Sequence, residues 1–229
     1  MLYLPNEPVR DVPKPVAPML RHDRARRGFT LLELMITVVI IGILVTLSIP
    51  SIARQLRDRR NNQAAHEIAA LVRIARVRAL GRGSAVLVRF TTATRGAVSS
   101  YEAVTIANGS GQNGSVAALP ATSCQGTNWG DVGNTVQPLG AFDPTKLGAY
   151  VNVSLTFYAA AVGSTTMAQQ NATTDICFSP LGRPYIKLNG AAQFTPMAQV
   201  PYFQVVPVDG IGLTRTVLVV PDGTARLAL

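Results

Sequence analysis

The stretch Gly28-Phe29-Thr30-Leu31-Leu32-Glu33 opens an apolar run that continues to Ile49 and decides how the chain folds. From Phe29 to Ile49 there are 21 residues, of which Glu33 alone is ionisable. A helix of that length rises about 31 Å, enough to cross the hydrocarbon core of a bilayer. Four arginines and one aspartate stand just before it, between Arg21 and Arg27. Because basic flanks stay in the cytoplasm, the sequence predicts a transmembrane helix at residues 29–50, with the rest of the chain exported.

Glu33 is the residue of this run that needs an explanation, because a carboxylate near the end of a membrane helix usually has a partner and a function. The stretch has a recognisable order: basic residues, Gly28, Phe29, an apolar run, and a glutamate as the fifth residue after Gly28. This order resembles the processing site of type IV prepilins and type II secretion pseudopilins. The resemblance implies that a prepilin peptidase cleaves after Gly28 and that Phe29 is then N-methylated. The alternative is an ordinary signal anchor with a chance glutamate. A cleaved secretory signal fits less well, since the run is long and no A-x-A-like site follows closely.

The expected role of Glu33 is assembly. Cleavage would give Phe29 an α-amine, and the Glu33 carboxylate of a staggered neighbouring subunit could pair with it, which would offset the desolvation of both groups. The resemblance implies several partners: other pilin or pseudopilin subunits, the prepilin peptidase, an inner-membrane assembly platform and membrane lipid. It also implies a bacterial inner-membrane protein with a periplasmic C-terminal domain, which later enters a pilus or pseudopilus.

Residues 1–28 are expected to be a leader peptide that is removed. The leader contains five prolines, which favour an extended chain. Leaders in the family are usually shorter, and a start at Met19 would give the ten-residue basic leader MLRHDRARRG. The hypotheses are therefore that Met19 is the true start or that Met1–Pro18 is dispensable.

Residues 51–82 are predicted to continue the helix as an amphipathic segment, after a kink at Gly42 and Pro50. Five apolar residues at helical spacing should face a sheet: Ile68, Leu71, Val72, Ala75 and Ala79. Eight arginines cover the remainder: Arg54, Arg57, Arg59, Arg60, Arg73, Arg76, Arg78 and Arg82. They are interpreted as a solvated face that contacts anionic lipid headgroups. Nucleic-acid binding is the alternative, although no aromatic residue lies between Pro50 and Arg89 to stack on bases.

Residues 83–229 are predicted to form a periplasmic β-rich domain with a Gly-rich insertion at 108–149. Alternating or β-rich patterns indicate eight strands: Ser84–Thr92, Ser100–Ala107, Tyr150–Ala160, Ile176–Ser179, Pro184–Leu188, Pro201–Val208, Arg215–Val220 and Thr224–Leu229. Pro221-Asp222-Gly223 is a hairpin turn signal between the last two. Trp129, inside the insertion, is either an exposed contact residue or a plug on the core, with the plug preferred. The fold class is therefore α+β, with the long helix packed on an antiparallel sheet.

Cys124 and Cys177 both lie in the exported part, where a pair of cysteines is interpreted first as a disulfide. Two unpaired buried thiols are the alternative. With His22 in the leader, two Cys and two His cannot make a closed zinc site, and no metal or cofactor is expected. The exported part contains no G-x-S-x-G, no P-loop, no paired His ligands and no cysteine with an obvious base, so no enzyme is predicted. Charged residues make up 14% of the chain, which fits a membrane segment followed by a sheet-rich domain.

A second resemblance lies in Ile176-Cys177-Phe178-Ser179-Pro180-Leu181-Gly182-Arg183-Pro184. It is similar to the F-x-P-x-G-R stretch of the GspH/FimT group of minor pilins and pseudopilins, through Phe178, Pro180, Gly182 and Arg183. A simple turn set by Pro180 and Gly182 would also account for it. In FimT-type proteins a G-R-x-R element contacts DNA. The matching site here keeps Gly223 and Arg226 but has Thr224 in place of the first arginine, and one arginine adds little phosphate affinity.

The main hypothesis is thus a minor pilin or pseudopilin of a type IV pilus or type II secretion pseudopilus. A DNA-binding minor pilin for natural transformation is the second hypothesis, and a signal-anchored periplasmic domain unrelated to filaments is the third.

Overall fold

The computed structural model describes residues 28–92, 94–106, 118–146, 152–160, 164–188 and 191–228. The predicted leader, except Gly28, and positions 108–117 and 147–149 of the predicted insertion lie outside these residues. The chain divides into two units, Met1–Thr46 and Leu47–Leu229. The described residues form one helix and twelve strands, and the predicted α+β class is confirmed.

Helix α1 (Leu31–Arg82) has 52 residues and begins at a capped N-terminus. Thr30 lies just before it, and its Oγ1 accepts a hydrogen bond of 3.2 Å from the amide of Glu33, so Thr30 is the N-cap. Gly83 follows the helix with φ +63°, the left-handed conformation that ends many helices and suits glycine. The helix is assigned without a break through Gly42 and Pro50, so the kink at these residues stays a prediction.

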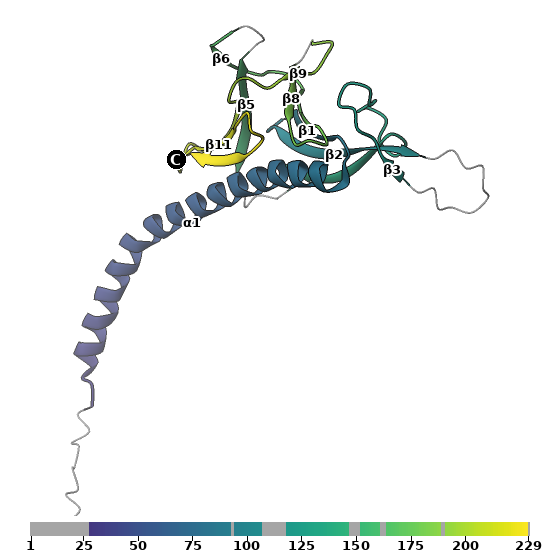
Figure 1. Ribbon diagram of the computed structural model, residues 1–229. Coiled ribbons are helices and arrows are strands. Elements are labelled where there is room, and N and C mark those ends of the chain that lie inside the picture. The colour runs from purple at the N-terminus through teal and green to yellow at the C-terminus, as the bar shows by residue number, and fades with distance from the viewer. Residues whose placement is uncertain are drawn as a thin grey trace, which may run out of the picture. The chain divides into compact units, whose positions relative to one another are not determined.

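The strands of the second unit make two sheets, and every strand pairing in the described residues is antiparallel (Figure 1). The first has the order β3-β2-β1-β7-β8-β9, with β4 also paired to β2. Its strands are β1 (Val86–Thr91), β2 (Ala97–Ile106), β3 (Ala118–Pro120), β4 (Val136–Phe142), β7 (Thr174–Phe178), β8 (Pro184–Lys187) and β9 (Thr195–Pro196). The second has the order β12-β11-β10-β5-β6. Its strands are β5 (Val153–Ala160), β6 (Met167–Gln169), β10 (Tyr202–Pro207), β11 (Arg215–Val219) and β12 (Ala225–Ala228).

The main core joins the second part of α1 to both sheets. The helix contributes a buried stripe of mostly small side chains, which lets its backbone approach the strands: Ala64, Ala65, Ile68, Ala69, Val72, Ala75 and Ala79. The sheets meet at three aromatic rings. Phe157 of β5 lies 5.7 Å from Phe90 of β1 and 4.6 Å from Phe203 of β10, measured between ring centroids. The alternation of strand side chains therefore places one face of each sheet in a single shared core.

The opposite face of the first sheet has a smaller core of its own. Leu87 of β1 points there, and so does its register partner Cys177 of β7. The segment between β3 and β4 covers them with Trp129, which is 6% exposed. The interpretation of Trp129 as a plug on the core is confirmed.

All eight predicted strands are present, and the last two form the predicted hairpin. Four strands were missed: β3, β4, β6 and β9. The predicted loop insertion at 108–149 is therefore corrected, since it contains β3 and β4. Strand β4 has the sequence VQPLGAF, in which proline and glycine interrupt the alternation, and its pairing with β2 shifts register between Ser100 and Tyr101.

A buried carboxylate fastens the end of α1 to the first sheet. Glu102 of β2 is fully buried, and its Oε2 lies 2.9 Å from Nε of Arg78. Its Oε1 lies 3.1 Å from Nε of Arg82 and accepts a 2.9 Å hydrogen bond from the hydroxyl of Ser84. The interpretation of the helix arginines as a solvated, lipid-contacting face is therefore corrected for Arg78 and Arg82, which pair within the domain.

Removing both arginines should destabilise the domain more than the sum of the single changes. Arg78→Ala or Arg82→Ala alone leaves Glu102 with one guanidinium and should cost about 1–2 kcal/mol. The double variant leaves a buried carboxylate without a counter-charge and should cost about 3–5 kcal/mol. Urea unfolding of the full chain in neutral detergent, followed by Trp129 fluorescence, measures this. Arg73→Ala is the control and should change little. Costs that simply add would contradict the account.

Candidate functional site

The N-terminal end of α1 presents the predicted cleavage site in exposed, non-helical chain. Gly28 and Phe29 precede the helix, and Phe29 is 78% exposed. Thr30 accepts hydrogen bonds from Glu33, through its hydroxyl, and from the Leu34 amide at 3.1 Å, through its carbonyl. The helical hydrogen bonds therefore begin after the Gly28–Phe29 bond, which a peptidase can reach without unwinding α1.

Glu33 is the third residue of this helix, counting from Leu31, so Thr30 and Glu33 have the spacing of a capping box. Sequence reasoning missed this local role, although the T-x-x-E pattern could have shown it. A carboxylate in the first turn also interacts favourably with the helix dipole. Glu33 is exposed, and its carboxylate forms no hydrogen bond or ion pair with any residue that the structure describes.

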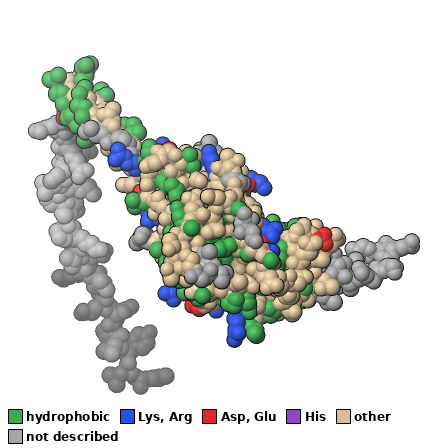
Figure 2. All heavy atoms as spheres, turned by 90° about the horizontal axis from the view of Figure 1, so that it is seen from above, with side chains coloured by type: hydrophobic (Ala, Val, Ile, Leu, Met, Phe, Trp, Pro, Cys, Tyr) green, Lys and Arg blue, Asp and Glu red, His purple; other side chains and the backbone are tan. Residues whose placement is uncertain are grey.

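The residues after Glu33 expose large apolar side chains all around α1. Eight span its first turns, each at least 51% exposed: Leu34, Met35, Ile36, Val38, Val39, Ile40, Ile41 and Ile43. Figure 2 shows hydrophobic side chains, in green, gathered on this helical segment at the upper left. Among the described residues, α1 is the one helix long and apolar enough to cross a membrane. Such a surface requires a lipid or protein environment.

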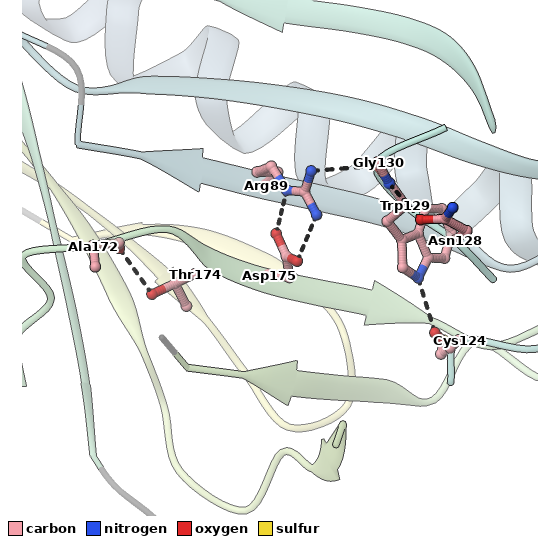
Figure 3. A network of polar contacts seen from close by, with 8 residues as sticks. All are labelled: Arg89, Cys124, Asn128, Trp129, Gly130, Ala172, Thr174 and Asp175. Carbon is pink, nitrogen blue, oxygen red and sulfur yellow. Dashed lines mark hydrogen bonds and ion pairs between the residues drawn. The ribbon is translucent and has the colours of Figure 1, made fainter. Parts of the chain in front are cut away.

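The disulfide lies in the β domain, far along the chain from this end. Cys124 and Cys177 are bonded, with their Cα atoms 6.0 Å apart, and both are buried. Beside them Trp129 donates its indole N–H to the carbonyl of Cys124 at 2.8 Å (Figure 3). The predicted disulfide is confirmed, and it ties the segment between β3 and β4 to β7.

An ion pair on β1 and β7 completes this network. Arg89 donates from Nε and one terminal nitrogen to the two oxygens of Asp175, at 2.7 and 2.9 Å (Figure 3). Its other terminal nitrogen donates to the carbonyl of Trp129 at 3.3 Å. The hydrogen bonds to Asp175 raise the pKa of Arg89, against the opposing effect of burial. Register partners 86 residues apart form this pair, so sequence reasoning missed it. Its role is structural.

The motif residues Phe178, Pro180, Gly182 and Arg183 form the turn from β7 to β8. Phe178 is in the core, whereas Arg183 is exposed. The Gly182 amide donates to the carbonyl of Ser179 at 2.7 Å. Gly182 has φ +73°, and a Cβ there would lie 3.0 Å from Leu80 of α1. The motif therefore seats a tight turn against the helix.

Gly223 and Arg226 lie in and after the neighbouring turn, between β11 and β12. Gly223 has φ +84°, and a Cβ there would lie 3.0 Å from Cδ and Nε of Arg76 on α1. Asp222 accepts 2.7 Å hydrogen bonds from the amide and hydroxyl of Thr224, which lower the pKa of Asp222. Arg226 is exposed. The turn therefore brings Arg76 of α1 close to Gly223.

Residues 23–49 match the family model described as the prokaryotic N-terminal methylation motif. The match covers the last basic residues before Gly28, the predicted cleavage site, Glu33 and the apolar run. The chain therefore carries a type IV pilin-like N-terminus, which points to a structural protein anchored in the membrane by its first helix. No curated protein and no solved structure matches the chain.

Proposed function

We propose that this chain is a minor pilin or pseudopilin, a structural subunit of a type IV pilus or type II secretion pseudopilus. The observation that carries the proposal is the methylation motif at residues 23–49, whose later part forms the first turns of a helix that is apolar on every side there. A permanent anchor needs only the apolar run. The motif adds an accessible bond after Gly28 and an unpartnered Glu33, and these are features of a subunit that is processed and assembled.

In this proposal the prepilin peptidase cleaves after Gly28, and Phe29 becomes the N-methylated first residue. The Glu33 carboxylate of one subunit pairs with the Phe29 amine of its neighbour. Lipid surrounds the helix before assembly, and helices of other subunits replace it afterwards. The exported β domain, with its buried disulfide, suits an oxidising periplasm. The sequence resemblance at Phe178, Pro180, Gly182 and Arg183 is the reason for placing the chain, within this proposal, in the GspH/FimT group of minor pilins and pseudopilins.

The pairing predicts a defect in assembly without a defect in processing. Glu33→Gln removes the charge but keeps the size and the helix propensity, so the precursor should still be cleaved. The amine of Phe29 then has no counter-charge, and incorporation into filaments should fall at least about tenfold, as expected for an unpaired charge in an apolar environment. Immunoblots of sheared filaments and of membranes measure both steps. Glu67→Gln, an exposed acid later on α1, is the matched control. Normal incorporation of Glu33→Gln would overturn the pairing.

A second candidate function is DNA binding at the turn between β11 and β12. The observation that favours it is Arg76, which α1 places against Gly223 although Thr224 replaces the first arginine of the G-R-x-R pattern. Arg76 and Arg226 both act electrostatically on Asp222. The guanidinium groups of Arg76 and Arg226 and the carboxylate of Asp222 therefore give this turn a small net positive charge.

DNA binding predicts salt-sensitive retardation of double-stranded DNA by the full chain in neutral detergent. Arg226→Ala and Arg76→Ala should each weaken binding and reduce the slope of log affinity against log salt by about one. Arg95→Ala, on the hairpin between β1 and β2, should leave the slope unchanged. Absence of retardation at low ionic strength would remove this candidate.

A further inference from the structure

A polar pocket lies between α1 and the connection from β10 to β11. Arg57, Arg60 and Asn61 line it from the helix, and Asn152 and Asp209 line it from the sheet side. Its volume is about 220 Å³, whereas a water molecule in the liquid occupies about 30 Å³. The pocket therefore has room for a polyatomic ligand, and its lining is mainly polar.

Asn61 is the residue of this pocket that lacks a partner. It is 4% exposed, and its Nδ2 makes no hydrogen bond in the part of the chain that the structure describes. A buried amide donor left without an acceptor is costly. The sequence nevertheless places this polar residue on the buried stripe of α1, one helical turn before Ala64 and Ala65. An acceptor supplied by a ligand would satisfy it.

The nearby carboxylates are already occupied by other donors. Asp209 accepts from Arg57 at 2.7 Å through one oxygen and from the Ile211 amide at 3.1 Å through the other. Asp58, one turn before Asn61, accepts from the Leu213 amide at 2.9 Å. These bonds hold the connection from β10 to β11 on the helix.

Gly212 keeps that connection close to Asn61. Its φ is +117°, and an added Cβ would lie 2.9 Å from both Asn61 Nδ2 and Asp58 Oδ1. The backbone of Gly212 thus passes close to the orphaned amide, and hydrogen bonds to Asp58 and Asp209 hold this connection in place. No acceptor among the described residues bonds to Asn61 Nδ2, so a bound ligand could supply one.

We propose that this pocket binds a tetrahedral oxyanion of the phosphate class. The guanidinium groups of Arg57 and Arg60 and the Nδ2 amide of Asn61 are hydrogen-bond donors only, so this lining suits a ligand that offers several acceptor oxygens. The donors come from the helix on one side and from Asn152 on the other. A phosphate group offers acceptor oxygens in several directions, whereas a carboxylate offers them in one plane.

Two sources present this group, a phospholipid headgroup and free phosphate. The pocket begins at Arg57, eight residues beyond Ile49, or about 12 Å along a helix. It therefore lies on the polar side of the apolar run, toward which a phospholipid presents its phosphate. The site does not depend on processing or on filament assembly.

The test is a phosphate titration of the full chain in an alkyl glycoside detergent, which contains no phosphate. Thermal unfolding is followed through Trp129 fluorescence at constant ionic strength. We expect a saturable rise in Tm with phosphate and none with chloride. Asn61→Asp replaces the donor by a carboxylate and should weaken the apparent affinity about tenfold or more. Asn62→Asp, the same charge change one residue along the helix and outside the pocket, should leave it within about twofold.

Two further measurements complete the design. If Asn61→Asp shows no cooperative unfolding, a second pair of variants with equal net charge replaces it. Arg57→Gln should weaken the apparent affinity for phosphate, whereas the control Arg59→Gln should leave it unchanged. The titration is then repeated in phospholipid nanodiscs. If lipid headgroups occupy the pocket, added phosphate should no longer raise Tm, whereas if free phosphate is the ligand, the rise in Tm should be the same as in detergent. Either result supports the site. No saturable rise in Tm in detergent, or equal responses of both members of a matched pair, would overturn it.

Discussion

The rest of this structure depends on one constraint, which is that a single helix must be stable in two different environments. Its first turns expose large apolar residues on every side, so that part is stable only in lipid or among other helices. Its last turns bury a narrow stripe of alanines with Ile68 and Val72, against which both sheets pack. The small side chains bring the backbone close to the strands, and polar residues on the helix can then contact the domain. Arg78 and Arg82 hold the buried Glu102, and Arg57 and Asp58 hold the connection from β10 to β11.

This arrangement gives the two ends of the helix different tasks. The N-terminal end carries the type IV pilin-like motif, with Gly28 and Phe29 in exposed chain and Glu33 in the first turn without a partner among the described residues. The C-terminal end is fastened by ion pairs and by two glycine turns that lie against Leu80 and Arg76. The disulfide and the Arg89–Asp175 pair stabilise the far face of the first sheet. In the proposed function, the first turns exchange lipid for neighbouring helices while these contacts keep the domain intact.

The sequence was sufficient for the helix and for the strands whose apolar residues alternate, because both patterns are local. The N-terminal site was also local, since a glycine, an apolar run and one glutamate define it. The four missed strands could not be predicted in the same way. Three of them have three residues or fewer, and β4 contains Pro138 and Gly140. The partners of Glu102 and Arg89 depend on strand register and helix packing, which no window of sequence contains. The orphaned amide of Asn61 likewise becomes visible only when the connection from β10 to β11 is in place.

The central claim is that the apolar helix begins a processed subunit, and the mature N-terminus tests it most directly. The chain would be expressed with a type IV prepilin peptidase, purified from the membrane fraction and analysed by intact mass spectrometry and N-terminal fragmentation. The account predicts a chain that begins at Phe29 and carries one methyl group on its α-amine. A chain that retains Gly28 and the residues before it would contradict the account and would identify the helix as an ordinary signal anchor.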